Sequence, residues 1–389
     1  MEKIIRLINQ NHCLQKDFIV VLLFLCISTS AQSQCVIRRG TLSTSSGSTV
    51  SVKGDVTVQG SMNNQGTILL QNNLSVGSAL ESPSGSLHLM GTNQQIQLNN
   101  TSFANLIVSG GGTKQLLGQL TVLEDFALID GTLQTNQTST LLLAASAQVS
   151  GGSAQSYVDG FLYHTGTGTK FYPVGSNGTY APATLLNITG NNPTVGVAYE
   201  PTTAIDGTPF HWQVETLSGT YSGAQAELSF TAPNADYVAY RDEVMVLAAE
   251  RPGSAYASLG QSSLSVRGDR FTISSDQPST LPILTVGFDI PASTKNLYVP
   301  NAFSSSAPNP EDQVVKVYGQ RISPNNFYLA IQDVWGNQVY ETRSWEEAST
   351  QGWRGPIGAA EVAATYRYLL KGEFVGGKRF QQSGTILHY

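Results

Sequence analysis

The sequence has little charge and few cysteines. Charged residues make up 12% of its 389 residues, and the formal net charge at pH 7 is −6. A mildly acidic surface lacks the basic patch that nucleic acid or an anionic membrane attracts, so we predict no nucleic-acid partner. The cysteines are Cys13, Cys26 and Cys35. Only Cys35 lies beyond the N-terminal apolar segment, so we expect no internal disulfide, and stability has to come from packed cores.

Patterns of catalytic and metal-binding residues are also absent. His88, His164, His211 and His388 lie far apart, and none has the spacing of a zinc site. His88 alternates within an apolar run, and we interpret it as a packed or edge side chain. The chain has no Gly-x-Ser-x-Gly motif, and residues 110–112, three glycines, lack the setting of a phosphate loop. The sequence therefore predicts no cofactor and no metal, and it assigns no enzyme activity.

The first 31 residues have the three-part pattern of a secretory signal peptide. Lys3, Arg6 and Lys16 precede an apolar run at 18–27, and small residues follow at 28–31. This run is shorter than the roughly 20 residues that span a bilayer. We predict cleavage after Ala31, or alternatively after Ser33, and no transmembrane span afterwards. A membrane anchor, a buried strand and a lipid-modified Cys35 are the alternatives.

Residues 36 to 150 alternate between apolar and polar side chains in short runs. Between Gly40 and Ser150 only seven residues are charged and only Phe103 and Phe126 are aromatic. Runs such as 56–58, 87–89 and 120–122 turn one face inward, with Gly and Asn between them. Such short strands are unstable alone but bury a core when stacked as coils. We predict a parallel β-helix-like solenoid with a cap over residues 36–182; an irregular antiparallel sandwich is the alternative.

Two further patterns belong to this region. The asparagine pairs at 63–64, 72–73 and 99–100 are candidates for side-chain ladders between coils. The aromatic residues Tyr157, Tyr163, Tyr172 and Tyr180 come next, and we expect them to cap the open end of the stack. The order of residues 157–182 also resembles a segment of large Bacteroidota surface proteins that ends a solenoid and leads into a sandwich.

Residues 183–290 have the pattern of an antiparallel β-sandwich. Alternating runs separated by Gly- and Pro-rich turns occur at 194–199, 211–214, 226–230, 244–247, 263–266, 271–273 and 281–288. We expect Trp212 to anchor the core of this unit.

Residues 296–389 carry an ordered series of aromatic and glycine motifs. They are the opening run 299–303, a strand-turn-strand run at 333–340, the run 353–355 and two closing strands. The motif residues are Pro300, Asn301, Phe303, Trp335, Gly336, Trp353, Gly355, Tyr366, Tyr368 and Gly384. This order resembles the gliding-motility-associated C-terminal domain, the type B sorting domain of the Bacteroidota type IX secretion system. The resemblance implies an immunoglobulin-like β-sandwich, recognition by the outer-membrane export machinery, and delivery to the cell surface or the medium.

Two departures from the family pattern concern acidic residues. The loop at 304–313 keeps only Glu311 and Asp312 where the family has an acidic Asn-Gly-Asp-Gly loop, and Arg354 stands where the family has Asp. A calcium-like site needs several converging carboxylates, so we expect no metal here.

The sequence thus predicts an all-β, multi-domain exported protein with a structural or adhesive role, and the resemblance adds a link to gliding motility. Its expected partners are the type IX export machinery and surface glycans or other surface proteins. The alternative is a polysaccharide-degrading or glycan-binding β-helix protein using Asp125 and Asp130, brought together on adjacent coils, because paired carboxylates hydrolyse glycosides. Against it, Asp130 precedes Gly131, a turn signal, so both acids can be solvated turn residues.

Overall fold

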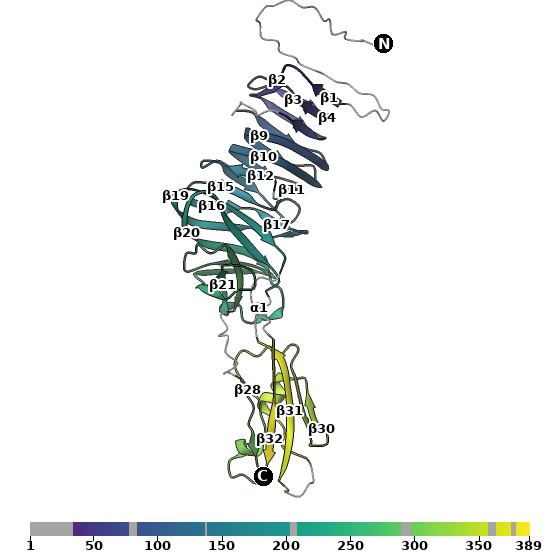
Figure 1. The fold of residues 1–389 in the computed structure, drawn as a ribbon, viewed down its shortest axis with the longest axis vertical. Coiled ribbons are helices and arrows are strands. Elements are labelled where there is room, and N and C mark those ends of the chain that lie inside the picture. Colours follow the sequence, from purple (N-terminus) through teal and green to yellow (C-terminus); the bar gives the residue numbers. More distant parts are fainter. Residues whose placement is uncertain are drawn as a thin grey trace, which may run out of the picture.

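The computed structural model describes residues 34–77, 84–136, 138–202, 208–288, 297–356, 363–374 and 379–389. Within them the chain is all-β, and its parts follow one another along one long axis (Figure 1). An N-terminal β-solenoid of about seven turns comes first, as predicted, followed by antiparallel strands and then a separate five-stranded sheet. The expected signal peptide, residues 1–31, lies outside the described residues. None of the helices in these described ranges is long and apolar enough to cross a membrane.

The solenoid stacks short parallel strands, each one coil from its partner. The side chains of Thr41 and Ser61, which lie 2.6 Å apart, belong to residues 20 positions apart, which is one coil. Alternation places Leu70, Leu87 and Leu106 inside, each with 0% of its surface exposed. The strands of the stack are β1 (Gln34–Ile37), β2 (Thr41–Thr44), β3 (Thr49–Val52), β4 (Asp55–Val58), β5 (Ser61–Asn64), β6 (Thr67–Leu70), β7 (Leu74–Val76), β8 (Ser86–Leu89), β9 (Asn93–Val108), β10 (Thr113–Leu128), β11 (Thr132–Gln134), β12 (Thr140–Leu143), β13 (Gln148–Gly151), β14 (Val158–Asp159), β15 (Leu162–Thr165) and β17 (Val174–Ser176).

Asparagine links neighbouring coils, though not as the uniform ladder expected. Asn73 joins three coils, because its Nδ2 donates to Asp55 Oδ1 at 3.1 Å and its Oδ1 accepts from Gln95 N at 2.8 Å. Asn64, fully buried, accepts a hydrogen bond from Thr44 Oγ1 and donates to Ser86 O at 3.2 Å. Asn100 instead adopts φ +45° where the register of β9 shifts. Asn and Gln side chains thus form hydrogen bonds between coils at the corners, where backbone pairing between the strands is interrupted.

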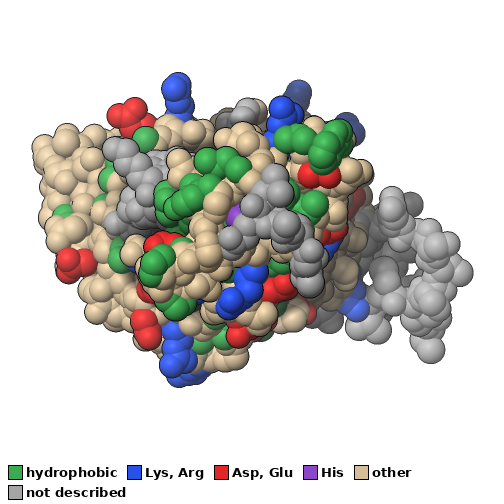
Figure 2. All heavy atoms as spheres, turned by 90° about the horizontal axis from the view of Figure 1, so that it is seen from below, with side chains coloured by type: hydrophobic (Ala, Val, Ile, Leu, Met, Phe, Trp, Pro, Cys, Tyr) green, Lys and Arg blue, Asp and Glu red, His purple; other side chains and the backbone are tan. Residues whose placement is uncertain are grey.

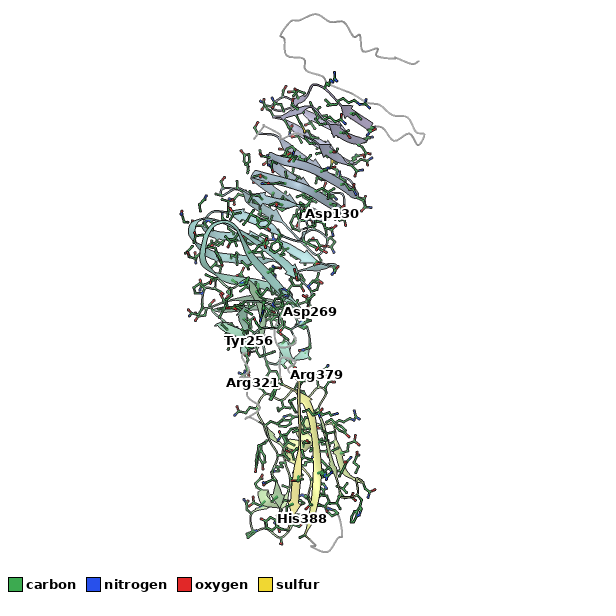
Figure 3. The ribbon with its side chains drawn as sticks, in the orientation of Figure 1. Asp130, Tyr256, Asp269, Arg321, Arg379 and His388 are labelled. Carbon is green, nitrogen blue, oxygen red and sulfur yellow. The ribbon has the colours of Figure 1, made fainter. Side chains whose placement is uncertain are left out.

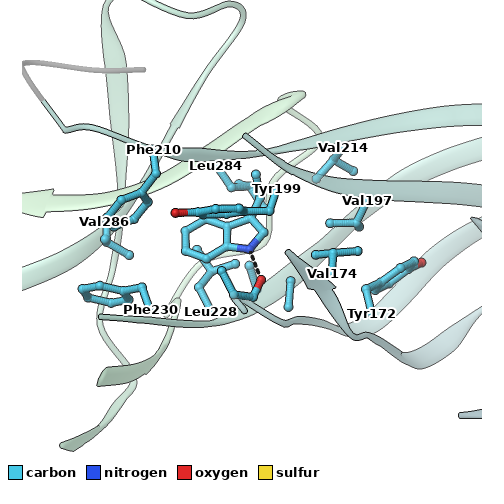
Figure 4. Close-up of a cluster of buried hydrophobic side chains, with 14 of the residues drawn as sticks. Tyr172, Val174, Val197, Tyr199, Phe210, Val214, Leu228, Phe230, Leu284 and Val286 are labelled. Carbon is cyan, nitrogen blue, oxygen red and sulfur yellow. Dashed lines mark hydrogen bonds between the residues drawn. The ribbon is translucent and has the colours of Figure 1, made fainter. Parts of the chain in front are cut away.

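The parallel stack passes directly into antiparallel strands. β15 pairs in parallel with β12 on one side and antiparallel with β19 (Ala183–Glu200) on the other, so the sheet continues across the expected boundary between residues 182 and 183. Of the four tyrosines expected to cap the stack, Tyr157, Tyr163 and Tyr172 are buried and Tyr180 is half-buried. Trp212 is the predicted core anchor, with 0% exposed and its Nε1 donating to Ala181 O at 2.8 Å (Figure 4).

All seven predicted runs of the middle unit lie in strands, but 211–214 and 226–230 belong to one strand, β20 (His211–Thr231), so the seven runs form six strands. Two of them, β19 and β20, are 18 and 21 residues long, much longer than expected. β20 continues through Gly219 and Gly223, both with positive φ, where the sequence analysis expected a turn between two strands. β19 continues through register shifts near Asn187 and Gly190, which also have positive φ. The elements are β16 (Gly168–Tyr172), β18 (Thr179–Tyr180), β19, β20 (His211–Thr231), α1 (Ala235–Ala239), η1 (Arg241–Glu243), β21 (Val244–Ala249), β22 (Tyr256–Gly260), β23 (Ser263–Arg267), β24 (Arg270–Ser274) and β25 (Ile283–Phe288).

The C-terminal unit has its own sheet, in the order β27, β32, β31, β29, β30. It meets the middle unit through polar contacts: Arg321 Nη2 lies 2.9 Å from Glu243 Oε2, and Ser323 Oγ donates to Asp236 Oδ2 at 3.2 Å (Figure 3). Its elements are β26 (Leu297–Tyr298), β27 (Ala302–Phe303), η3 (Pro310–Gln313), β28 (Tyr318–Gly319), β29 (Tyr328–Gln332), β30 (Gln338–Thr342), α2 (Trp345–Thr350), β31 (Ala364–Glu373) and β32 (Arg379–His388).

The interior of the solenoid gives a first testable prediction. Leu120 of β10 points inward with 0% exposed, whereas Thr121 beside it faces outward and is half-buried. We expect Leu120→Ala to lower the free energy of unfolding by about 2–5 kcal/mol, because it removes buried methyl groups and leaves a cavity. Thr121→Ala is the matched control and should change stability by less than about 0.5 kcal/mol. Urea unfolding followed by circular dichroism measures both; equal losses would contradict the inward placement of Leu120.

Candidate functional site

Three aromatic motif residues of the C-terminal unit, Phe303, Trp353 and Tyr366, meet in one cluster together with His388. The ring of Phe303 stacks on His388 at a centroid distance of 4.5 Å and lies 5.3 Å from the ring of Trp353. Trp353 in turn meets Tyr366 edge-on at 4.7 Å. These residues come from β27, the segment after α2, β31 and β32, so the fold brings together positions that are far apart in the sequence. All four side chains are buried.

Two motif glycines leave room for aromatic rings: Gly355 for Phe303 of the cluster, and Gly384 for Tyr368. A Cβ atom on Gly384 would lie 2.7 Å from Tyr368 Cε1, on the neighbouring strand. Gly355 has φ +87°, and a Cβ there would lie 3.2 Å from Phe303 Cζ. Both positions therefore favour glycine, the first for space and the second for backbone conformation as well. The pattern of aromatic residues and glycines describes one packing arrangement.

The opening run of the motif, residues 299–303, provides β27, the strand at one edge of the five-stranded sheet. β27 pairs in parallel with β32, and Asn301 O accepts a hydrogen bond from Leu387 N at 2.9 Å. Phe303 O likewise accepts from Tyr389 N at 3.2 Å. Asn301 thus contributes its backbone, and half-buried Pro300 precedes it.

The hairpin part of the motif stands apart from the cluster. β29 and β30 pair antiparallel as predicted, and Asp333 organises the turn between them. Its Oδ1 accepts from Trp335 N at 2.9 Å and from Asn337 N at 2.8 Å, while its Oδ2 accepts from Asn337 Nδ2. These hydrogen bonds lower the pKa of Asp333, and the bond from the Asn337 side chain contributes most. Gly336 supplies the left-handed φ of +87°.

Trp335 is presented to solvent at this turn, with 84% of its surface exposed. The motif therefore divides into a buried cluster and an exposed hairpin tip. Other large apolar side chains are exposed on this unit; they are Tyr298, Tyr318, Val334, Val339, Leu387 and Tyr389. Figure 2, which views the C-terminal end, shows hydrophobic patches scattered among polar and charged side chains rather than one continuous surface.

The shortened acidic loop forms an ion pair. Glu311 lies 3.0 Å from Lys316 Nζ and also accepts from Tyr318, and the hydrogen bond from Lys316 is the main cause of its lowered pKa. Asn309 caps the short η3 helix by accepting from Glu311 N. In the part of the chain that the structure describes, no group of three or more His, Cys, Asp and Glu side chains could hold a metal ion.

The expected placement of Asp125 and Asp130 on adjacent coils is wrong. Both belong to one coil: Asp125 pairs with Gln148 at the start of the last segment of β10, and Asp130 follows the end of that segment. Five residues of extended chain span roughly 16 Å, beyond the separation of about 5–9.5 Å that paired glycosidase carboxylates need. Both acids are exposed, so they are better explained as surface residues. Asp130 lies on the solenoid in Figure 3.

The sequence analysis missed the role of Lys114, a buried charge inside the solenoid. Its side chain has 0% exposed and donates to Gly111 O. Burial lowers the pKa of Lys114, and the carboxylate of Asp130 opposes that shift. The inward position was readable, since Lys114 and Leu116 share the alternation of β10.

Two further ionisable groups lie at the junction of solenoid and middle unit. Tyr163 donates to Glu215 Oε1, and its burial raises the pKa of the phenol. His164, one residue on, is 2% exposed and meets the ring of Tyr172 edge-on at 5.4 Å. Burial, aided by the charge of Lys170, lowers the pKa of His164 to about 3. Its side chain is therefore a neutral core group. His88 faces outward from β8, with Nε2 2.8 Å from Ser109 Oγ, and β8 is paired on both sides, so His88 is not an edge residue.

Comparisons with protein-family models, with curated proteins and with solved structures find no match to this chain.

The two motif tryptophans provide a matched test of this geometry. We expect Trp353→Ala to lower the free energy of unfolding of the C-terminal unit by about 3–5 kcal/mol, because a buried ring is lost from the cluster. Trp335→Ala should change it by less than about 0.5 kcal/mol, because the indole is exposed. Urea unfolding of the two variants measures the difference, and a large loss for Trp335→Ala would show that the indole is packed.

His164 predicts an acid-sensitive junction. An unfolded chain binds a proton at His164 near pH 6.5, whereas the folded chain does so only near pH 3. The stability that His164 contributes is thus fully present above pH 6.5 and falls as the pH drops towards 3. Between pH 6.5 and 5 we expect a loss of about 2 kcal/mol from this group. Urea unfolding of the wild type and of His164→Leu at pH 6.5 and pH 5 measures the part of this loss that is due to His164. If the stability of both proteins fell equally with pH, the prediction would be wrong.

Proposed function

We propose that this chain is an exported cell-surface or extracellular protein, and that residues 296–389 are a type B sorting domain of the type IX secretion system. One observation supports this most strongly. Three of the aromatic motif residues on which the resemblance depends, Phe303, Trp353 and Tyr366, pack against one another in the aromatic cluster. A domain that shares the family's fold is expected to bury these ring positions together in its core.

The strand pairing also supports the expected architecture of both later units. The five-stranded sheet and the small β26–β28 pair are compatible with an immunoglobulin-like β-sandwich. The antiparallel strands β19 to β25, with Trp212 between them, are compatible with a second sandwich.

The proposed role outside the cell is structural or adhesive. The described parts form an elongated stack with a mainly apolar interior and an outer surface rich in Ser, Thr, Asn and Gln (Figure 1). Such a shape suits a stalk or spacer with many weak contacts to surface proteins or glycans. The separation of Asp125 and Asp130 removes the specific reason for the glycan-hydrolysing alternative. A link to gliding motility rests on the resemblance alone.

Localisation tests the proposal. In a Bacteroidota host with type IX secretion, a tagged full-length chain is expected outside the outer membrane, and a chain lacking residues 296–389 is expected to stay in the periplasm. A periplasmic reporter fused to residues 296–389 should be exported, and the same fusion carrying Trp353→Ala should be retained. Export of the truncated chain, or retention of the unmodified fusion, would overturn the sorting assignment.

A further inference from the structure

The two ends of the solenoid differ in how they are covered. At the C-terminal end β19 crosses the last coils antiparallel, and Tyr172 and Trp212 are fully buried beneath the middle unit. At the N-terminal end lie β1, β2 and β3, which pair with β4, β5 and β6 on one side only within the described residues (Figure 1).

Burial changes between the first coil and the second. In the second coil Val58, Ile68 and Leu70 are 0–4% exposed. Their register partners in the first coil, Ile37, Val50 and Val52, are only half-buried, although they point inward in the same way. Cys35 and Leu42 complete this half-buried ring. Within the described residues, the first coil therefore lacks the apolar cover that the second coil obtains from its neighbours.

Backbone groups also point to the open end. Ser48 O and Val52 O accept from the second coil at 2.8 and 3.0 Å, so the groups of Ser51, between them, face away from it. In β2, Gly40 O and Thr44 O accept from the second coil at 3.0 and 3.1 Å, so the groups of Ser43 likewise face the open end. A row of such edge groups is a template for pairing with another strand.

The proposed export explains why the chain itself leaves this end open. Cleavage after Ala31 leaves only Gln32 and Ser33 before β1, too little chain to cover three strands. This step rests on the proposed function. Continued β-pairing over this coil then needs another chain that presents three strand edges in the same three-sided outline with apolar side chains inside. The matching surface among the described residues is the same end of a second copy.

We propose that the open coil, residues 34–52, binds the open coil of a second copy, giving a two-fold symmetric, head-to-head dimer. A two-fold axis makes facing strands antiparallel, so the edges of all three sides can pair at once. The half-buried rings of the two copies then cover each other. The coil supplies nearly the 20–30 residues per side of a standard interface.

The two-fold axis can pass through the middle of β1, of β2 or of β3, and the charges at the corners of the coil favour one of these three positions. Arg38 and Arg39 are exposed at the corner between β1 and β2. An axis through the middle of β2 places β2 against its own copy and β1 against the partner's β3. Each arginine corner then faces the uncharged corner at 45–48, and only Lys53, close to Asp55, faces its own counterpart. The other two axes bring the arginines towards Lys53 or towards each other.

The test is the oligomeric state of residues 32–389, produced without export. Sedimentation over low to high micromolar concentrations is expected to show a monomer–dimer equilibrium. The variant Ser43→Pro/Ser51→Pro removes two edge N–H groups while its side chains stay on the exposed face, and it should weaken dimerisation at least tenfold. Ser43→Ala/Ser51→Ala keeps those N–H groups and is the matched control, expected to dimerise as wild type does. A monomeric wild-type chain, or a dimer that both variants form equally, would overturn the proposal.

Hydrogen exchange on the unmodified chain gives a second readout that needs no substitution. Amides of the first coil should gain protection as protein concentration rises, while those of the second to sixth coils should not change. Protection independent of concentration would contradict the dimer even if the proline variant failed to fold. Because this chain is not exported, a dimer result is independent of secretion: failed export with an intact dimer would count against the sorting assignment alone.

Discussion

Backbone pairing between successive coils, with one apolar side chain in two pointing inward, is the constraint on which the solenoid depends. A four-residue strand such as β6 buries too little surface to be stable alone, but its partners β3 and β8 cover both of its edges. Each coil therefore relies on its neighbours, and stability is shared along the stack. The solenoid can therefore consist of polar, almost charge-free sequence, because its outward side chains need only be small and compatible with water.

At the C-terminal end of the solenoid, where the repetition of coils stops, larger side chains fill the core. The junction with the middle unit contains Tyr172, Trp212 and neutral His164, which fill the space that a further coil would occupy. The long strands β19 and β20 cross there because their register shifts bend them around the end of the stack. The C-terminal unit uses a different solution, in which aromatic rings gather around two glycines.

The parts of this structure that the sequence predicts are those with a short period. Alternation located the coils, and the strands of the middle unit, because each inward side chain lies two residues from the next. Long-range geometry was not readable in the same way. Asp125 and Asp130 looked like a pair, yet an extended strand separates them. The length of β20 was hidden because glycines that bulge a strand, such as Gly219 and Gly223, resemble glycines that end one. The packing of Phe303 on Trp353 required the fold, since no local pattern connects them.

The coil period has a mechanical consequence. Each coil of about twenty residues advances the stack by one strand spacing, about 4.8 Å, whatever its outward side chains are. Inserting or deleting a whole coil would therefore change the distance between the two ends in equal steps and leave the junction and the C-terminal unit unaltered. The number of coils therefore sets the length of the solenoid. That length can change during evolution independently of the parts at its two ends.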